Sequence, residues 1–191
     1  MNEGVTDIAD PAELLAELGK LRGEVAQLRE RIQLLDQLAH QDTLIALPNR
    51  RGFLRELDRL IARANRYHTP AALLYVDLNG LKMINDSFGH HVGDEALVEV
   101  AARLVKGVRR SDVVARIGGD EFGILLENSD ERKARETASR LAELIGENEF
   151  VYDEENLPLS VAIGVAVIEP NDSAADVMAR ADEEMYRQKA A

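Results

Sequence analysis

The 191-residue sequence predicts an α/β chain of the α+β type, with a mixed β-sheet flanked by helices and a separate coiled-coil helix at the N-terminus. Three observations predict this class. Leucines recur at heptad spacing near the N-terminus, strand-like and helix-like runs alternate over the rest of the chain, and two strand-like runs are joined by a short turn with two glycines. Strands that alternate with helices, plus one hairpin, are typical of a sheet with helices packed on it.

The coiled-coil helix is predicted within residues 1–41 from two interleaved apolar series. Branched side chains at heptad position a, with leucine at d, favour a parallel two-stranded coil. In a parallel pair each g side chain faces the next e side chain of the partner, and these pairs carry opposite charges. The alternative is a single amphipathic helix packed on its own domain. The d positions are Leu14, Leu21, Leu28 and Leu35, the a positions are Leu18, Val25 and Ile32, and the facing pairs are Glu17–Arg22, Glu24–Arg29 and Arg31–Asp36.

The second domain is predicted over residues 42–191. Pro48 cannot continue a helix, and Asn49 is a suitable cap for a new helix, FLRELDRLIARANRY. A buried strand, AALLYVDL, and a polar loop, NGLKMINDSFGHHVGD, come next, followed by a helix, EALVEVAARLVKGV. The paired strands VVARI and FGILLE precede a helix, ERKARETASRLAELIGE, a strand, PLSVAIGVAVI, and a final helix, AADVMARADEEMYRQK.

Composition and charge exclude several classes of protein. A hydrophobic fraction of 46% over 191 residues allows one ordinary core. The chain has no cysteine, which excludes disulfides, thiolate metal sites and a cysteine nucleophile. A net charge of −12 argues against passive attraction to nucleic acid. With no apolar run long enough to span a bilayer and no signal-peptide pattern, we expect a soluble, cytoplasmic protein that binds no membrane.

Carboxylates at two strand ends suggest a metal site. Asp77 closes the run AALLYVD, and Asp120 and Glu121 follow Gly118 and Gly119 at the predicted hairpin. An Asp at a strand end can simply cap the next turn, and Asp-Glu is common in exposed turns. The glycines, however, permit unusual backbone angles and the close approach of another group. Carboxylates with only oxygen donors suit Mg²⁺, which proteins usually hold together with substrate phosphates, so the pattern points to a nucleoside triphosphate.

The sequence contains neither a GxxxxGK[ST] loop nor a GxGxxG turn after a strand. Phosphate binding would therefore depend on metal ions and a few cations. Lys82, just beyond Asp77, is one candidate, although a lone surface lysine is ordinarily only a solvated charge.

The segment GGDEF at 118–122 resembles the signature of the GGDEF-family diguanylate cyclases. Further motifs appear in the family's order: LPNRR at 47–51, VDL at 76–78, IND at 84–86, FGH at 88–90, GD at 93–94, RRSD at 109–112, and ADEEMY before Lys189. The resemblance covers residues 42–191. It implies a fold like the palm of nucleotidyl cyclases and polymerases, and the joining of two GTP molecules into cyclic di-GMP with release of two pyrophosphates.

The resemblance also implies roles at the metal and the triphosphate. Asp77, the main-chain carbonyl of Leu78, and Asp120 would hold Mg²⁺, with Mn²⁺ as a possible substitute. Glu121 would support the metals or the attacking hydroxyl, and Lys82 would meet the triphosphate.

Four further residues are implied for the nucleotide. Lys189 would assist at the triphosphate, Asn85 and Asp94 would read the guanine edge, and His90 lies beside them in sequence. A carboxylate at position 94 can accept hydrogen bonds from the N1–H and amino group of guanine, so GTP should be preferred over ATP.

Arg109 and Asp112 match the family's inhibitory product site, with Arg116 as an accessory. Arginine and carboxylate suit a phosphate and a guanine edge. The ordinary reading of this spacing elsewhere is a surface ion pair. In the VDL region Asn79 and Leu81 depart from the family pattern, but the implied metal ligands are retained.

The implied reaction needs two active sites face to face, each with one GTP. A parallel coil would tether two catalytic domains and raise their effective concentration, so we expect a homodimer. Two other functions stay open: a catalytically weak domain that binds GTP or cyclic di-GMP as a regulatory module, and a coiled-coil scaffold with an inert domain. The scaffold explains the N-terminal segment but not the ordered motifs.

Overall fold

The computed structural model describes residues 11–147 and 150–189. The chain divides into two compact units, one ending at Ala39 and the other beginning at His40. Within the described residues, no helix is both long and apolar enough to cross a membrane.

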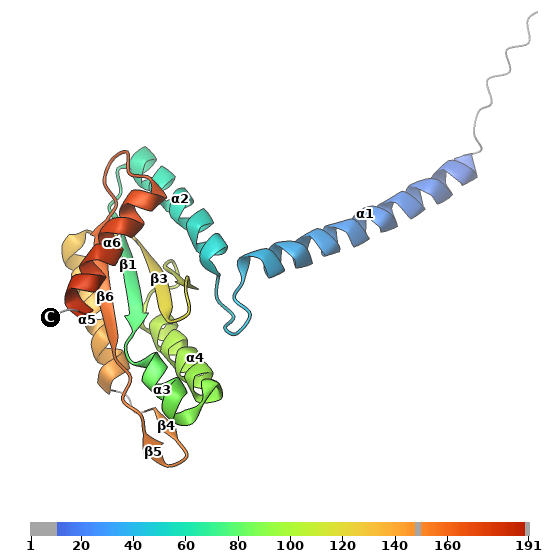
Figure 1. Ribbon diagram of the computed structural model, residues 1–191. Helices are drawn as coiled ribbons and strands as arrows, with labels where there is room; N and C mark the ends of the chain where they lie inside the picture. The colour runs from blue at the N-terminus through green and yellow to red at the C-terminus, as the bar shows by residue number, and fades with distance from the viewer. Residues whose placement is uncertain (1–10, 148–149, 190–191) are drawn as a thin grey trace, which may run out of the picture. The chain divides into compact units, whose positions relative to one another are not determined.

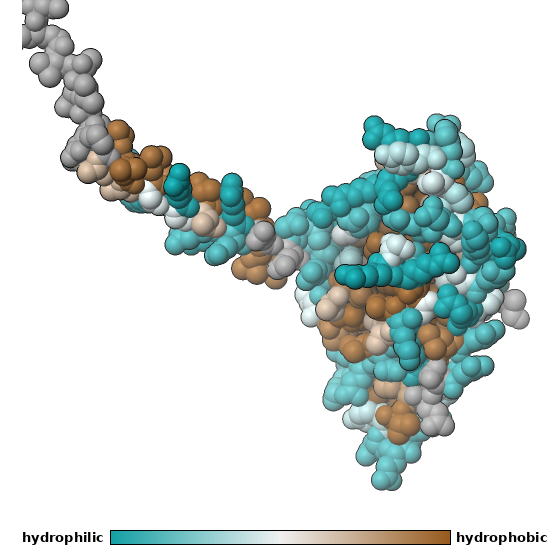
Figure 2. Space-filling model, turned by 180° about the vertical axis from the view of Figure 1, so that it is seen from behind, coloured by the Kyte–Doolittle hydropathy of each residue, from teal (hydrophilic) through white to brown (hydrophobic). Residues whose placement is uncertain are grey.

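The first unit contains helix α1 (Pro11–His40) up to Ala39, and the heptad pattern predicted this helix. The side chains at the a and d positions are 45–64% exposed, and Figure 2 shows hydrophobic side chains along the helix. Three more leucines outside the two series, Leu15, Leu34 and Leu38, are also exposed. The predicted helix is thus confirmed, whereas its pairing with a second copy stays a prediction.

The second unit is built on a four-stranded sheet in the order β2–β3–β1–β6 (Figure 1). The strands are β1 (Ala71–Leu78), β2 (Val113–Arg116), β3 (Glu121–Glu127) and β6 (Val161–Val167). This confirms the predicted α+β class. All neighbouring strands are antiparallel, so the sheet is not mixed as the alternation of strands and helices suggested. The reason is that β3 inserts between the parallel strands β1 and β2, which is the split β-α-β arrangement.

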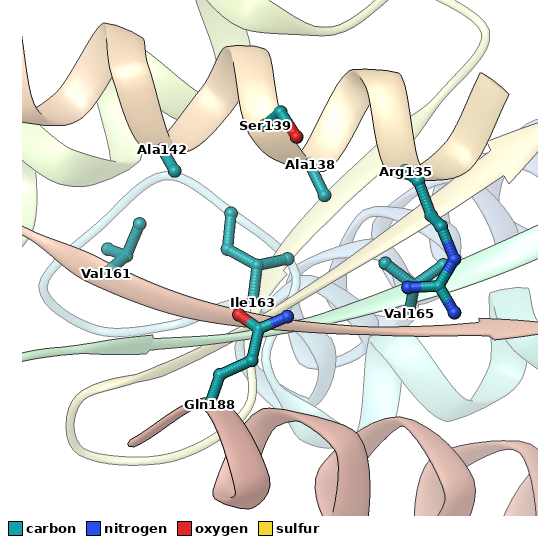
Figure 3. Close-up of a pocket in the computed structure, with 8 residues that line it drawn as sticks. All are labelled: Arg135, Ala138, Ser139, Ala142, Val161, Ile163, Val165 and Gln188. Atoms are coloured by element: carbon teal, nitrogen blue, oxygen red, sulfur yellow. The ribbon is translucent and has the colours of Figure 1, made fainter. Parts of the chain in front are cut away.

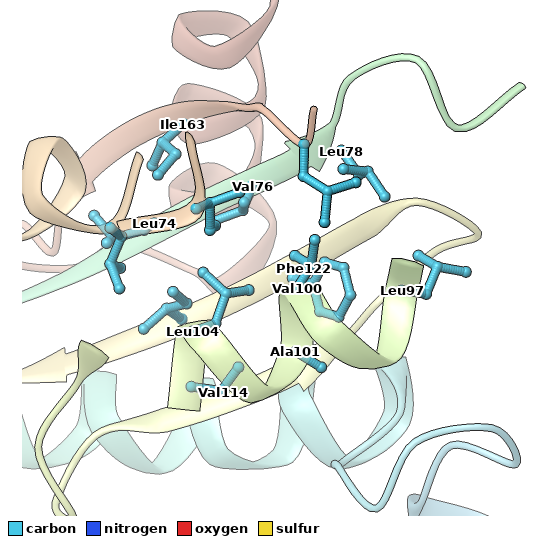
Figure 4. Packing of buried hydrophobic residues seen from close by; sticks show 14 of the residues in the cluster. Leu74, Val76, Leu78, Leu97, Val100, Ala101, Leu104, Val114, Phe122 and Ile163 are labelled. Atoms are coloured by element: carbon cyan, nitrogen blue, oxygen red, sulfur yellow. The ribbon is translucent and has the colours of Figure 1, made fainter. Parts of the chain in front are cut away.

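Helices cover both faces of the sheet (Figure 1). α2 (Arg50–Tyr67) and α6 (Ala174–Lys189) pack on one face, and α4 (His90–Gly107) and α5 (Glu131–Glu147) pack on the other. Every residue of β1 is buried, as expected for a central strand. Successive side chains alternate between the two faces: Leu73 and Tyr75 point toward α2 and α6, and Leu74 and Val76 point toward α4 and α5 (Figure 4).

Asn49 caps α2 as predicted, because its side chain accepts hydrogen bonds from the main-chain N–H groups of Arg51 and Gly52. The segment predicted as a polar loop instead contains α3 (Leu81–Phe88) and the start of α4. Its glycines mark helix ends: Gly80 and Gly89 have φ angles of 74° and 88° and flank α3.

A second, two-stranded sheet was not predicted. It pairs β4 (Val151–Tyr152) with β5 (Glu155–Asn156). Strands of two residues are too short to show the alternation from which a strand is predicted.

Candidate active site

The antiparallel register brings the predicted carboxylates together at one end of the sheet. Asp77 of β1 and Glu121 of β3 are directly opposite partners. The main-chain N–H of Leu78 donates to the carbonyl of Asp120 over 2.9 Å. Two segments that lie far apart in sequence therefore end side by side, with three carboxylates on neighbouring strand ends.

Asp77 is buried, with 6% of its surface exposed. The Lys189 ammonium, at the end of α6, donates to Oδ1 of Asp77 over 2.5 Å. Burial raises the pKa of Asp77 above its ordinary value; Lys189 opposes this, and the nearby charges of Asp120 and Asp182 raise the pKa further. The fold therefore holds a carboxylate whose charge is only partly compensated by its lysine partner, which is the environment in which a bound cation is favoured.

The two glycines of the hairpin turn have different surroundings. Neither has a positive φ angle, so the turn does not use the unusual backbone angles that glycine permits. A Cβ at Gly118 would overlap the carboxylate of Glu121, whereas a Cβ at Gly119 would meet nothing within 4 Å. Gly118 thus makes room for a side chain of the site itself, and Gly119 borders open space.

Arg116 ties this turn to the segment that follows α1. Its guanidinium donates to the carbonyl of Gly119 over 2.8 Å and forms an ion pair with Asp42 at 3.2 Å. Both side chains of the pair are largely buried, at 14% and 17% exposure. The main-chain N–H of Arg116 also donates to the carbonyl of Pro48.

Four of the residues implied for the triphosphate and the base lie on α3 and α4, immediately after the Asp77 end of β1. Lys82, His90 and Asp94 are exposed, and Asn85 is half-buried. A Cβ at Gly93 would overlap the side-chain oxygen of Asn85. The glycine therefore lets α4 approach α3 closely, so Asn85 lies beside the turn of α4 that carries Asp94.

Arg109 and Asp112 line a small pocket of about 50 Å³. Oδ2 of Asp112 accepts a hydrogen bond from the main-chain N–H of Arg109 over 2.9 Å. Lys133 and Arg140, both on α5, line the same pocket, whereas the predicted accessory Arg116 does not and is instead engaged at the hairpin turn. No sequence motif pointed to the two α5 cations, since only the packing of α5 brings them to the pocket.

The donor set fits a magnesium ion. No group of three or more His, Cys, Asp and Glu side chains in the described part of the chain is arranged to hold a metal by itself. Magnesium, however, is usually bound by one or two carboxylates together with substrate phosphates and water. The carboxylates of Asp77 and Asp120 are close enough for the charge of Asp120 to raise the pKa of Asp77, and they provide such a pair.

Hollows elsewhere on this unit include two beside α6. One, of about 270 Å³, lies along β6 between α5 and α6, where Ile163 points toward α5 and Arg135 and Gln188 stand at its borders (Figure 3). None of the predicted site residues lines it. The other is a groove of about 540 Å³ between α2 and α6, which is lined by Tyr75 together with Arg50 and Asp182.

Two neighbouring strand ends with paired carboxylates and the Lys189 ammonium have the donor set of a metal-dependent nucleotide site. Residues 39–191 match the family model described as "Diguanylate cyclase, GGDEF domain". The chain therefore belongs to the GGDEF domain family.

The chain is similar to proteins with this domain. It is 35% identical over 167 residues to the probable diguanylate cyclase DgcE of Escherichia coli K12, which covers 87% of this chain and 15% of that protein. It is 34% identical over 200 residues to the response regulator PleD of Caulobacter vibrioides NA1000. This alignment covers 98% of this chain and 43% of PleD. The chain thus spans less than half the length of these two curated relatives.

A solved structure extends the similarity to both units. The coiled coil and GGDEF domain of DgcB from Caulobacter crescentus, in complex with c-di-GMP, superimposes with a TM-score of 0.85 at 29% identity. The alignment covers 93% of this chain and 94% of that chain.

Proposed function

We propose that this protein is a diguanylate cyclase, which condenses two GTP molecules into cyclic di-GMP and releases two pyrophosphates. The observation that carries the proposal is the meeting of Asp77 and Asp120 at neighbouring strand ends, with Lys189 on the buried carboxylate. Family membership and relatives named as diguanylate cyclases support it.

Asp77, the carbonyl of Leu78 and Asp120 would hold Mg²⁺, with Glu121 beside them. When bound, the metal lowers the pKa of the attacking ribose 3′-hydroxyl and neutralises charge on the phosphate oxygens. Each 3′-hydroxyl attacks the α-phosphorus of the other GTP, the bond to the β-phosphate oxygen breaks, and pyrophosphate leaves. Lys189, which pairs with Asp77 in the structure, would contact the triphosphate when GTP is bound.

Guanine would be selected on α3 and α4. Asp94 accepts from N1–H and the amino group of guanine, and Asn85, which packs against the neighbouring Gly93, contacts the same edge. Adenine lacks this pair of donors and would leave the carboxylate without partners, so GTP is preferred over ATP. Lys82 meets the triphosphate, and His90 borders the base.

The reaction requires two domains, each with one GTP. A parallel coiled coil of α1 would supply the second domain, since the a and d side chains are at least 45% exposed in the single chain. The DgcB structure, described as a coiled coil and GGDEF domain, supports this arrangement.

Product inhibition would act at the pocket of Arg109 and Asp112. The cations of Lys133 and Arg140 line the same pocket and suit the phosphates of cyclic di-GMP. The c-di-GMP complex of DgcB supports binding of the product by this kind of domain.

The test is incubation of the full chain with GTP and Mg²⁺, followed by chromatography for cyclic di-GMP and pyrophosphate. The wild-type protein should form both, and Asp120→Ala should lose at least about 100-fold in kcat, because one of two metal-binding carboxylates is gone. Asp58→Ala, an exposed aspartate on α2, is the matched control. Equal rates from wild type and Asp120→Ala would refute the metal assignment, and binding of GTP or cyclic di-GMP without turnover would favour the regulatory module instead.

A further inference from the structure

Tyr75, two residues before Asp77, occupies an unusual row of the sheet. Its partner on β3 is Gly123 and its partner on β6 is Gly164, so no side chain stands beside the tyrosine on either neighbouring strand. The spacing of two residues puts Tyr75 on the same face of β1 as Asp77.

The spaces above Gly123 and Gly164 are filled by residues of α2 and α6. A Cβ at Gly123 would lie 2.5 Å from the ring of Phe53, and a Cβ at Gly164 would overlap the carbonyl oxygen of Ala181 on α6. The ring of Tyr75 is therefore enclosed by Phe53 on one side and the backbone of α6 on the other, and only 5% of the residue is exposed.

Tyr75 and Glu121 lie on the same face of the sheet, where the tyrosine hydroxyl is within interaction range of the Glu121 carboxylate. Glu121 lies two positions along β3 from Gly123, which is the diagonal neighbour that a long side chain can reach. Burial raises the pKa of Tyr75 to about 12; the charge of Glu121, its hydrogen bond and the charge of Asp182 act in the same direction, and Arg50 opposes them. The strand register therefore places the tyrosine and the glutamate side by side on one face of the sheet.

Glu121 is confined on its other side as well. Its carboxylate lies against Gly118, where a Cβ would overlap it. The side chain is thus held between the main chain of the hairpin turn and the hydroxyl of a tyrosine that is itself enclosed.

We propose that Tyr75 is a positioning residue, whose hydroxyl orients the Glu121 carboxylate toward the metal site at the end of β1. This role rests on the proposed function, in which Glu121 supports the metals or the attacking hydroxyl. Tyr75 itself contacts neither the substrate nor the metal. Loss of its hydroxyl should therefore slow the chemical step and leave GTP binding, which other side chains provide, nearly unchanged.

The test is Tyr75→Phe in the full chain, which keeps the packed ring and removes only the hydroxyl. The variant should lose about tenfold in kcat, with KM for GTP within about twofold of the wild type. The Mg²⁺ concentration for half-maximal rate should rise, a readout that a purely structural role would not move. Tyr67→Phe, at an exposed tyrosine at the end of α2, is the matched control and should behave as wild type.

A second measurement follows the contact without turnover. Urea unfolding of wild type, Tyr75→Phe, Glu121→Ala and the double variant should show that the two single effects are not additive. Additive effects, or a kcat of Tyr75→Phe within twofold of wild type, would overturn the inference. If the wild type forms no cyclic di-GMP, the proposed function fails and the positioning role fails with it, whereas the unfolding cycle still decides whether the contact exists.

Discussion

At the scale of single residues, the surroundings of Asp77 disfavour the ionised form of its carboxylate. The side chain is buried at a strand end, and the lysine that compensates it comes from the last turn of α6. Burial raises the pKa of the carboxyl, so the ionised form is less favourable in the folded chain than in the unfolded chain. A carboxylate kept under these conditions is better explained by a ligand than by stability.

We therefore expect Asp77→Asn to stabilise the metal-free protein at pH 7. The folded-state pKa is raised above the unfolded value of 3.8, so ionisation of Asp77 destabilises the fold as the pH rises through this range. The advantage of the variant should be a Tm increase of roughly 2–4 °C, equivalent to about 1 kcal/mol, and should shrink toward pH 4. Thermal unfolding at several pH values measures it. Added Mg²⁺ should stabilise the wild type but not the variant.

Asp130 is a control, because its pKa is shifted in the opposite direction to that of Asp77. Its pKa is lowered, chiefly by the hydrogen bond from the main-chain N–H of Lys133. Its contribution to stability is present above the unfolded pKa and is lost as the pH falls through the folded value. Asp130→Asn should thus destabilise slightly at pH 7. A loss of stability in Asp77→Asn at pH 7 without metal would contradict the account of Asp77.

At the scale of elements, the hairpin turn between β2 and β3 is stabilised by contacts with a segment distant in sequence. The N–H groups of Ile117 and Gly118 donate to the carbonyl of Glu121 and close the turn. The Arg116 side chain then links the carbonyl of Gly119 to Asp42, and Asp42 precedes Arg116 by 74 residues. The turn that carries the carboxylates therefore depends on the segment just after α1 for its position.

Asp42→Asn should loosen this turn. It removes the charge from a largely buried ion pair but keeps an oxygen that can accept the hydrogen bonds from Leu44 and Ile45. We expect a loss of about 1–2 kcal/mol in the free energy of unfolding, measured in urea. Hydrogen exchange of the amides of Ile117 and Gly118 should become faster.

The exposed pair Arg59–Glu56 provides the control. Glu56→Gln should cost less than about 0.5 kcal/mol, because exposed ion pairs contribute little. If Asp42→Asn and Glu56→Gln lower the free energy of unfolding equally, the turn does not depend on the Asp42–Arg116 pair. The same conclusion follows if hydrogen exchange at the turn is unchanged in Asp42→Asn.

At the scale of the whole molecule, each compact unit has a feature that a second copy of the chain would complete. The first unit exposes the apolar side chains of α1, and the second carries one proposed GTP site where the reaction needs two. A parallel coil of two chains would bury those side chains and bring two sites to the same assembly.

Charged residues in the predicted seam should therefore abolish both assembly and turnover. Val25→Lys with Ile32→Lys places charges at two a positions, and we expect a monomer by light scattering and a loss of more than about tenfold in activity per chain at low concentration. Gln27→Lys, at an outer position of the same helix, should remain dimeric and active. Undiminished activity per chain of a monomeric variant would exclude this role of α1.

Much of the fold follows from local pattern. The heptads predicted α1, the apolar run predicted β1, and Asn49 predicted the start of α2. Local pattern failed at α3, where the short helix carries polar residues between two glycines, and at the two-residue strands. In both places too few residues contact the core for burial to produce a visible period.

The sequence by itself determined the family and the longer helices and strands, because side-chain period and motif spacing are local properties of the chain. Only the tertiary structure decided that Glu121 lies opposite Asp77, that Arg116 reaches Asp42, and that Tyr75 stands between two glycines. Those facts depend on strand register and helix docking, which arise from contacts between segments distant in sequence. The same long-range packing places the ammonium of Lys189 on the carboxylate of Asp77.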